Sequence, residues 1–198
     1  MNDKMKIGLF GGSFDPIHVG HLICAQSAVN FASLDRVFFI PTAMPPHKGR
    51  EGLTDFEIRA NMVALAIDGN PYFELSLIES EEHITYTYET VLHFKEKGFG
   101  KERIHLIVGS DSLEEIETWR KPDVIFSHAT VVAMVRPGYD HLPALPPGAA
   151  IIMIETGSNS ISSSEIRKLA REGKSIRYLV PSSVERYIID NSLYNETT

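Results

Sequence analysis

Two histidines lie three residues apart, shortly after a pair of glycines near the start of the chain. The run Gly11-Gly-Ser-Phe-Asp-Pro-Ile-His18-Val-Gly-His21 follows an apolar segment, and a second apolar run begins at Leu22. Glycine lets backbone N–H groups approach a ligand closely, and the N-terminus of a helix attracts anions. Side chains three residues apart share one face of a helix, so both imidazoles can reach the same group. The run therefore predicts a phosphate-binding turn between a strand and a helix.

The spacing of the glycines excludes two common phosphate motifs. Gly8, Gly11 and Gly12 fit neither the dinucleotide pattern G-x-G-x-x-G nor the Walker pattern that ends in Gly-Lys-Ser/Thr. A dehydrogenase that binds a ready-made dinucleotide is disfavoured for this reason. A non-catalytic nucleotide sensor is a further alternative, but it would have no need of two phosphate-contacting histidines.

A metal site is an alternative interpretation of the histidines, because Cys24 follows His21 at the same spacing. Helical placement disperses the third of these residues, however, and no clear fourth ligand is present. We interpret Cys24 as a small core residue. A purely structural role would explain one histidine near a helix start more readily than two beside a Gly-Gly turn.

A second candidate phosphate motif lies far along the chain, in Ile161-Ser-Ser-Ser-Glu-Ile-Arg167. Ser162 and Glu165 have the spacing of a capping box, which predicts a helix start. Ser163 and Ser164 add hydroxyl groups to the positive end of that helix, with Arg167 one turn inside it. The alternative is a well-capped helix whose arginine belongs to a solvated basic face.

The two motifs, in this order, resemble the nucleotidyltransferase superfamily marked by H-x-G-H. Within it the chain is most similar to the bacterial nicotinate mononucleotide adenylyltransferases. The resemblance extends from Lys6 to about Ile189, and the intermediate segments that carry it are Pro45–Lys48, Thr85–Thr87, Gly109–Asp111, Trp119 and Arg136–Gly138.

This resemblance implies transfer of the adenylyl group of ATP to nicotinate mononucleotide, giving nicotinate adenine dinucleotide and pyrophosphate in NAD biosynthesis. It implies Mg²⁺ bound with ATP and no metal site of the protein's own. The catalytic residues would be His18 and His21 on the α- and β-phosphates and Arg167 on the leaving side. Another phosphate acceptor, nicotinamide mononucleotide or phosphopantetheine, is the alternative.

The resemblance also implies which residues contact each substrate. Trp119 would stack on the cationic pyridinium ring, although a partly buried packing role is its alternative. Asp111 would contact the ribose hydroxyls, with helix capping as its alternative. The ATP site would comprise Gly11, Gly12, Ser13, Phe14, His18, His21, Gly109, Asp111, Ser163, Ser164 and Arg167. The acceptor site would comprise Lys48, Thr85, Tyr86, Thr87, Trp119 and Arg136. The backbone N–H groups of the turn at Thr85–Thr87 would donate to the nicotinate carboxylate, while the roles of His47 and Asp15 stay open.

Strand-like and helix-like segments alternate along the chain and would position these residues. This pattern predicts an α/β, Rossmann-like, doubly wound parallel sheet in a single domain, 1–198, with a small C-terminal helical end. The expected strands are Met5–Phe10, Arg36–Ile40, Tyr72–Ile78, Arg103–Val108, Thr130–Val135 and Ala150–Ile154. The expected helices are His21–Ala32, Asp55–Asp68, Tyr88–Lys97, Ser112–Glu117 and two at the C-terminal end. Capping boxes are expected at Thr54 with Glu57, Ser162 with Glu165 and Ser182 with Glu185. The long stretches Pro41–Leu53 and Pro137–Gly148 are expected to be binding loops.

The composition fits a small cytoplasmic enzyme. The chain has 198 residues, a formal net charge of −7 and one cysteine. The negative charge argues against nucleic-acid binding, so an ATP site must be locally positive, and the candidates for that charge are His18, His21, Lys48, Arg136 and Arg167. We expect no signal peptide and no membrane segment, and a homo-oligomer is compatible with the sequence.

Overall fold

The computed structural model describes residues 4–43, 53–81, 84, 86–139, 145–157 and 161–195. His47, Lys48 and Thr85 lie outside these residues, as do residues 44–52 of the first expected binding loop and 140–144 of the second. Within them, no helix is both long and apolar enough to cross a bilayer.

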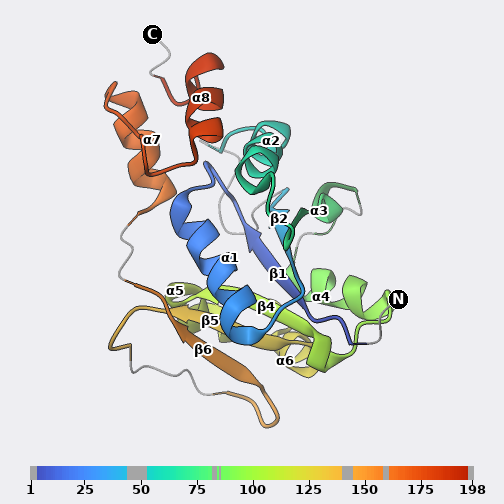
Figure 1. Cartoon of the computed structure of the whole chain (residues 1–198). Helices are drawn as coiled ribbons and strands as arrows, with labels where there is room; N and C mark the ends of the chain where they lie inside the picture. The colour runs from blue at the N-terminus through green and yellow to red at the C-terminus, as the bar shows by residue number, and fades with distance from the viewer. Residues whose placement is uncertain are drawn as a thin grey trace.

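A six-stranded, entirely parallel sheet forms the centre of the fold (Figure 1). Its strands lie in the order β3-β2-β1-β4-β5-β6. The order reverses between β1 and β4, which creates the switch point where parallel sheets bind ligands at the carboxyl ends of their strands. The predicted fold class is therefore confirmed. The strands are β1 (Ile7–Gly12), β2 (Arg36–Pro41), β3 (Phe73–Leu75), β4 (Ile104–Gly109), β5 (Thr130–Val135) and β6 (Ile151–Glu155).

Helices cover both faces of the sheet. One hydrophobic cluster includes side chains of α1, α2, α7 and α8, and a second includes side chains of α3, α4, α5 and α6. The helices are α1 (Val19–Ala32), α2 (Phe56–Ile67), α3 (Ile78–Glu81), α4 (Thr87–Glu96), α5 (Ser110–Glu115), α6 (Pro122–His128), α7 (Ser163–Arg171) and α8 (Ser182–Asp190), with 3₁₀ turns η1 (Lys101–Arg103) and η2 (Ile116–Thr118).

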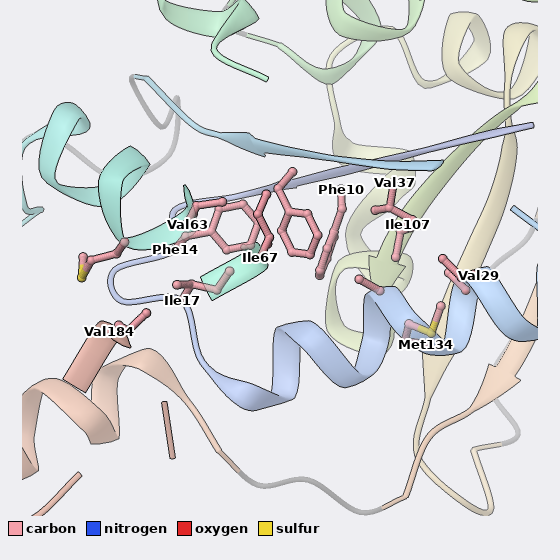
Figure 2. Close-up of a cluster of buried hydrophobic side chains, with 14 of the residues drawn as sticks. Phe10, Phe14, Ile17, Val29, Val37, Val63, Ile67, Ile107, Met134 and Val184 are labelled. Carbon is pink, nitrogen blue, oxygen red and sulfur yellow. The ribbon is translucent and has the colours of Figure 1, made fainter. Parts of the chain in front are cut away.

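The central strands are apolar at almost every position because both faces of the sheet are covered. Successive residues of a strand point to opposite faces. Val132 and Met134 of β5 accordingly join the first cluster, whereas Val131 and Ala133 join the second. Figure 2 shows the first cluster, in which Met134 meets Val29 of α1.

One expected strand differs from the structure, and one helix of the structure was not expected. The third strand is restricted to Phe73–Leu75, and Ile78–Glu81 forms the short helix α3 rather than the end of that strand. The helix α6 was not expected, although Pro122 at its first position is a typical helix start.

Of the three expected caps, only that at Ser162 is confirmed, where its hydroxyl accepts from the Glu165 N–H at 3.2 Å. The prediction for Thr54 is wrong, because α2 begins after Asp55. The backbone N–H of Thr54 instead donates to Asp15, and its carbonyl accepts from the Arg59 side chain. The prediction for Ser182 is also wrong, because the N-cap of α8 is Pro181 and Ser182 is already helical.

Gly8 of β1 allows a close approach of the first cluster to the sheet. An added Cβ would lie 2.8 Å from Ile107 Cδ1 and 2.9 Å from Leu34 Cδ1. We therefore expect Gly8→Ala to lower the free energy of unfolding by about 1–3 kcal/mol through overpacking. Gly11→Ala is the matched control in the same strand, because its added Cβ would meet no atom within 4 Å. Urea denaturation of both variants tests this, and equal stability of the two would contradict it.

Candidate active site

A cavity of about 410 Å³ opens at the carboxyl ends of β1, β2 and β4, at the switch point of the sheet. Six of the residues predicted to bind substrates line it, namely Gly11, Gly12, His21, Thr87, Gly109 and Trp119. Residues that the sequence did not indicate also line it, including Thr42, Glu79, Thr90 and Ser112. The cavity thus brings the glycine pair and His21 together with Trp119 and the start of α4.

His18 and His21 form a stacked pair at the start of α1. Their ring centroids are 3.7 Å apart with 26° between the planes, and His18 is the N-cap. The His18 backbone N–H donates to Nδ1 of His21 at 3.2 Å. Because Nδ1 accepts this bond, a neutral His21 carries its proton on Nε2. The Nε2 atom of His21, which does not take part in the bond with the His18 N–H, is therefore a hydrogen-bond donor.

Burial keeps both imidazoles neutral. It lowers the pKa of His18 to about 4 and, with the added repulsion of a charged His18, holds the pKa of His21 well below its usual value. The histidines are thus N–H donors at neutral pH in the ligand-free protein, not the cations that the sequence analysis expected. Among the described residues, none is a hydrogen-bond partner of the buried His18 Nδ1.

Phe14, which packs closely against Gly12, carries the left-handed backbone conformation in the turn after β1. Gly11 and Gly12 belong to β1, and neither has a positive φ, whereas the buried Phe14 has a φ of 47°. The ring of Phe14 packs on Phe10 and on His21, with centroids 5.7 Å and 5.0 Å apart. Phe14 thus packs against both Phe10 and the His21 ring.

The second motif packs directly on this turn. Ser163 Oγ donates to the Pro16 carbonyl at 2.9 Å, and Arg167 Nη1 donates to the Asp15 carbonyl at 2.6 Å across 152 residues of sequence. Arg167 Nη2 also donates to Ser164 Oγ at 3.4 Å. The two candidate phosphate motifs therefore form one unit, although none of these three α7 side chains lines the cavity.

On another wall of the cavity, Trp119 and the start of α4 are held beside each other by two cation–π contacts. The Arg120 guanidinium carbon lies 4.9 Å from the Tyr86 ring centroid, and Lys121 Nζ lies 4.6 Å from that of Tyr88. Trp119 is half-buried, at the end of η2. This brings two positive charges to the region predicted to bind the acceptor.

One backbone N–H at the N-terminus of α4 already has a hydrogen-bond partner within the protein. The Tyr86 N–H donates to Glu89 Oε2 at 3.0 Å, which satisfies one of the backbone donors predicted for the acceptor. Thr87, the first residue of the helix, lines the cavity. The carboxylate-binding role of this segment stays a prediction.

Two further predicted residues, Asp111 and Arg136, lie outside the cavity lining. Gly109 ends β4 and is the N-cap of α5, so Asp111 is not that cap. Asp111 is exposed and accepts from Ser110 Oγ at 3.3 Å. Arg136 follows β5 and is exposed. Neither Asp111 nor Arg136 lines the cavity.

Arg59 of α2 is the main residue that the sequence analysis missed. Its side chain is 1% exposed, and it donates to three backbone carbonyls: Ser13 at 2.7 Å, Thr42 at 2.8 Å and Thr54 at 2.7 Å. Arg59 thus joins Thr42, after β2, and Thr54, before α2, to the backbone of Ser13 in the turn. Only the position of Arg59 on the buried side of α2 could have indicated this role.

Glu79 of α3 is a second missed residue. It is 8% exposed and accepts from the Ala43 N–H at 3.0 Å. Burial raises the pKa of its carboxyl group to about 7, although the Ala43 N–H and Arg59 act in the opposite direction. A group that changes charge near neutral pH therefore lies in the cavity wall.

Comparisons with known proteins show the family of the chain. Residues 9–169, which include most of the parallel sheet and the turn after β1, match the cytidylyltransferase-like family. A protein of Thermoanaerobacter sp. named "Probable nicotinate-nucleotide adenylyltransferase" is 38% identical over 99% of this chain and 97% of its own. One of Thermus thermophilus with the same name is 41% identical over 96% and 100%. The chain belongs to the cytidylyltransferase-like family and, within it, to the nicotinate-nucleotide adenylyltransferases.

A solved structure shares the fold. The Plasmodium falciparum nicotinic acid mononucleotide adenylyltransferase complexed with NaAD superposes with a TM-score of 0.78 at 23% identity, over 96% of this chain and 97% of that one.

The raised pKa of Glu79 predicts a pH-dependent stability. Between its usual pKa of 4.5 and about 7, the unfolded chain ionises this carboxyl group while the folded protein keeps it protonated. The folded state therefore loses stability as the pH rises through this window. Glu79→Gln retains an acceptor for the Ala43 N–H and removes the charge. We expect the stability of the variant relative to the wild type to increase by about 2–3 kcal/mol from pH 5 to pH 8.

Urea denaturation of both proteins at a series of pH values measures this difference. A difference that does not change with pH would show that Glu79 is ionised in the folded protein at acidic pH as well.

Proposed function

We propose that the protein transfers the adenylyl group of ATP to nicotinate mononucleotide, releasing pyrophosphate, as a step of NAD biosynthesis. The observation that carries the proposal is the single cavity that joins the His21 phosphate-binding turn to Trp119 and Thr87. A phosphate oxygen of the mononucleotide forms the new bond to the α-phosphorus of ATP. The bond from that phosphorus to the β,γ-pyrophosphate oxygen breaks, and pyrophosphate leaves with the electron pair.

This reaction needs no general base, because the attacking phosphate is already an anion. Catalysis then consists of aligning the attacking and leaving oxygens and stabilising the charge of the triphosphate. The Nε2–H of His21 and the His18 imidazole are the donors that we assign to the α- and β-phosphates. A triphosphate next to these rings favours their protonated forms, so ATP binding raises both pKa values.

Magnesium would enter as part of the ATP substrate. Among the described residues there is no group of three His, Cys, Asp or Glu side chains that could hold a metal ion. That finding includes His18, His21 and Cys24, so it does not support the alternative metal site. Mg²⁺ in such a site is coordinated by substrate phosphates and water, and it offsets the negative charge of the triphosphate.

Acceptor recognition is assigned to the wall formed by Trp119 and the start of α4. An indole face attracts a pyridinium ring, and the N-terminus of a helix attracts a carboxylate. Arg120 and Lys121, held over Tyr86 and Tyr88, add positive charge to the same region. These features favour nicotinate mononucleotide over an acceptor with a neutral carboxamide.

We expect kcat/KM to favour nicotinate mononucleotide over nicotinamide mononucleotide by at least about tenfold, because a badly paired polar group costs about 1–3 kcal/mol. Pyrophosphate release from ATP, measured with a panel of phosphate acceptors that includes phosphopantetheine, gives the ratio. Trp119→Ala should weaken both pyridine acceptors equally and preserve the ratio, because the ring is common to them. Turnover with phosphopantetheine alone would refute the proposed function, and equal kcat/KM for the two pyridine acceptors would refute the assigned carboxylate site.

His21→Ala should lower kcat by roughly 10²–10³, the usual loss for one preorganised donor to a transition state. The matched control is His128→Ala on α6, where the imidazole contacts Lys95 Nζ at 3.2 Å away from the cavity, and its kcat should equal that of the wild type. Thermal melts show whether each variant is folded. A folded His21→Ala variant with unchanged kcat would exclude His21 from the reaction.

A further inference from the structure

Asp15 lies at the centre of the proposed phosphate-binding turn, outside the cavity lining. Its side chain is 1% exposed. Oδ1 accepts from the Tyr194 hydroxyl at 2.6 Å, and Oδ2 accepts from the Thr54 N–H at 3.2 Å. Its backbone carbonyl accepts from Arg167. One residue of the turn is therefore bonded to the start of α2, to α7 and to the C-terminal end of the chain.

Tyr194 reaches this carboxylate across 179 residues of sequence. The residue has a φ of 65°, in the left-handed region that non-glycine residues adopt only when surrounding contacts require it. Burial and the charge of Asp15 raise the pKa of its hydroxyl far above the usual value. The hydroxyl thus stays protonated at any physiological pH and can only donate to Asp15.

The segment that carries Tyr194 also packs on the turn. In Figure 2, Val184 of α8 lies near Ile17 and Phe14, and all three belong to the first hydrophobic cluster. The cation that compensates the charge of Asp15 is Arg59, which holds the Ser13 carbonyl. The contacts of Asp15 and Arg59 thus hold the turn at Ser13 and Asp15, a few residues before His18, the N-cap of α1.

We propose that Tyr194 is a positioning residue for the adenylyl transfer: its hydroxyl holds Asp15 and thereby the turn that presents His18 and His21 to the triphosphate. The inference rests on the proposed function. Tyr194 does not line the cavity, so we expect it to act on the reaction through the geometry of the turn. A displacement of about 1 Å at a catalytic group can lower a rate by up to about 10².

Tyr194→Phe removes one hydroxyl and leaves the packing of the ring. We expect kcat to fall about tenfold, with little change in KM for nicotinate mononucleotide, because the acceptor wall at Trp119 has no contact with Asp15 or Tyr194. Tyr187→Phe is the matched control. Its hydroxyl accepts from Asn61 Nδ2 of α2 at 3.4 Å and, within the described part of the chain, has no hydrogen bond to the turn, so its kcat should match that of the wild type.

Hydrogen exchange provides a readout that does not depend on activity. In Tyr194→Phe, exchange should increase in a peptide spanning Phe10–Leu22 and stay unchanged in one spanning Thr87–Glu96. A Tyr194→Phe variant whose exchange or kcat equals that of Tyr187→Phe overturns the inference, even if its melting temperature is lower. Absence of turnover in the wild type refutes the proposed function instead, while the exchange data still test the positioning of the turn.

Discussion

The three hydrogen bonds of the buried Arg59 guanidinium are the constraint on which the site depends. A buried charge is tolerated only when its donors are satisfied and a counter-charge is near. Arg59 meets both conditions with the carbonyls of Ser13, Thr42 and Thr54 and with the neighbouring carboxyl groups of Asp15 and Glu79. The turn between β1 and α1 lacks regular secondary structure, so its backbone groups need partners from elsewhere. Arg59 therefore couples the folding of α2 to the shape of the phosphate-binding turn.

The same burial determines how the histidines can act. Because His18 and His21 are stacked and desolvated, the free protein holds them as neutral donors, and the backbone N–H of His18 fixes the tautomer of His21. Preorganised dipoles stabilise charge without reorganising during the reaction. A chain with a net charge of −7 can therefore present a phosphate site without a dense cluster of cations. Arg167 is partly committed to the Asp15 carbonyl, so it contributes to the shape of this site as well as to its charge.

The sequence predicted the six parallel strands because burial on both faces leaves continuous apolar runs, as in β4 and β5. It also indicated six residues of the cavity wall: Gly11, Gly12 and His21 belong to the motif that follows β1, whereas Thr87, Gly109 and Trp119 were implied by the family resemblance. It could not indicate Arg59, Glu79 or Tyr194, since each reaches the site through a tertiary contact that no local pattern encodes. The errors at Thr54 and Ser182 have the same origin. A serine or threonine before an acidic residue indicates a helix start, but backbone bonds to Asp15 and Arg59, or a preceding proline, decide where the helix begins.

The two ends of the cavity differ in how they attract an anion, and this difference follows from burial. At the proposed phosphate end the imidazoles are buried and neutral, whereas the proposed acceptor end has the exposed charges of Arg120 and Lys121, which lie over the rings of Tyr86 and Tyr88. Exposed charges act through a field that salt screens, so they favour an acid over an amide without fixing its orientation. Orientation must come from the directed groups in the wall, the Thr87 helix start and the Trp119 face. Glu89 already occupies the Tyr86 N–H, which leaves fewer backbone donors for the acceptor and makes the positive charges of this wall more important for selecting the acid form.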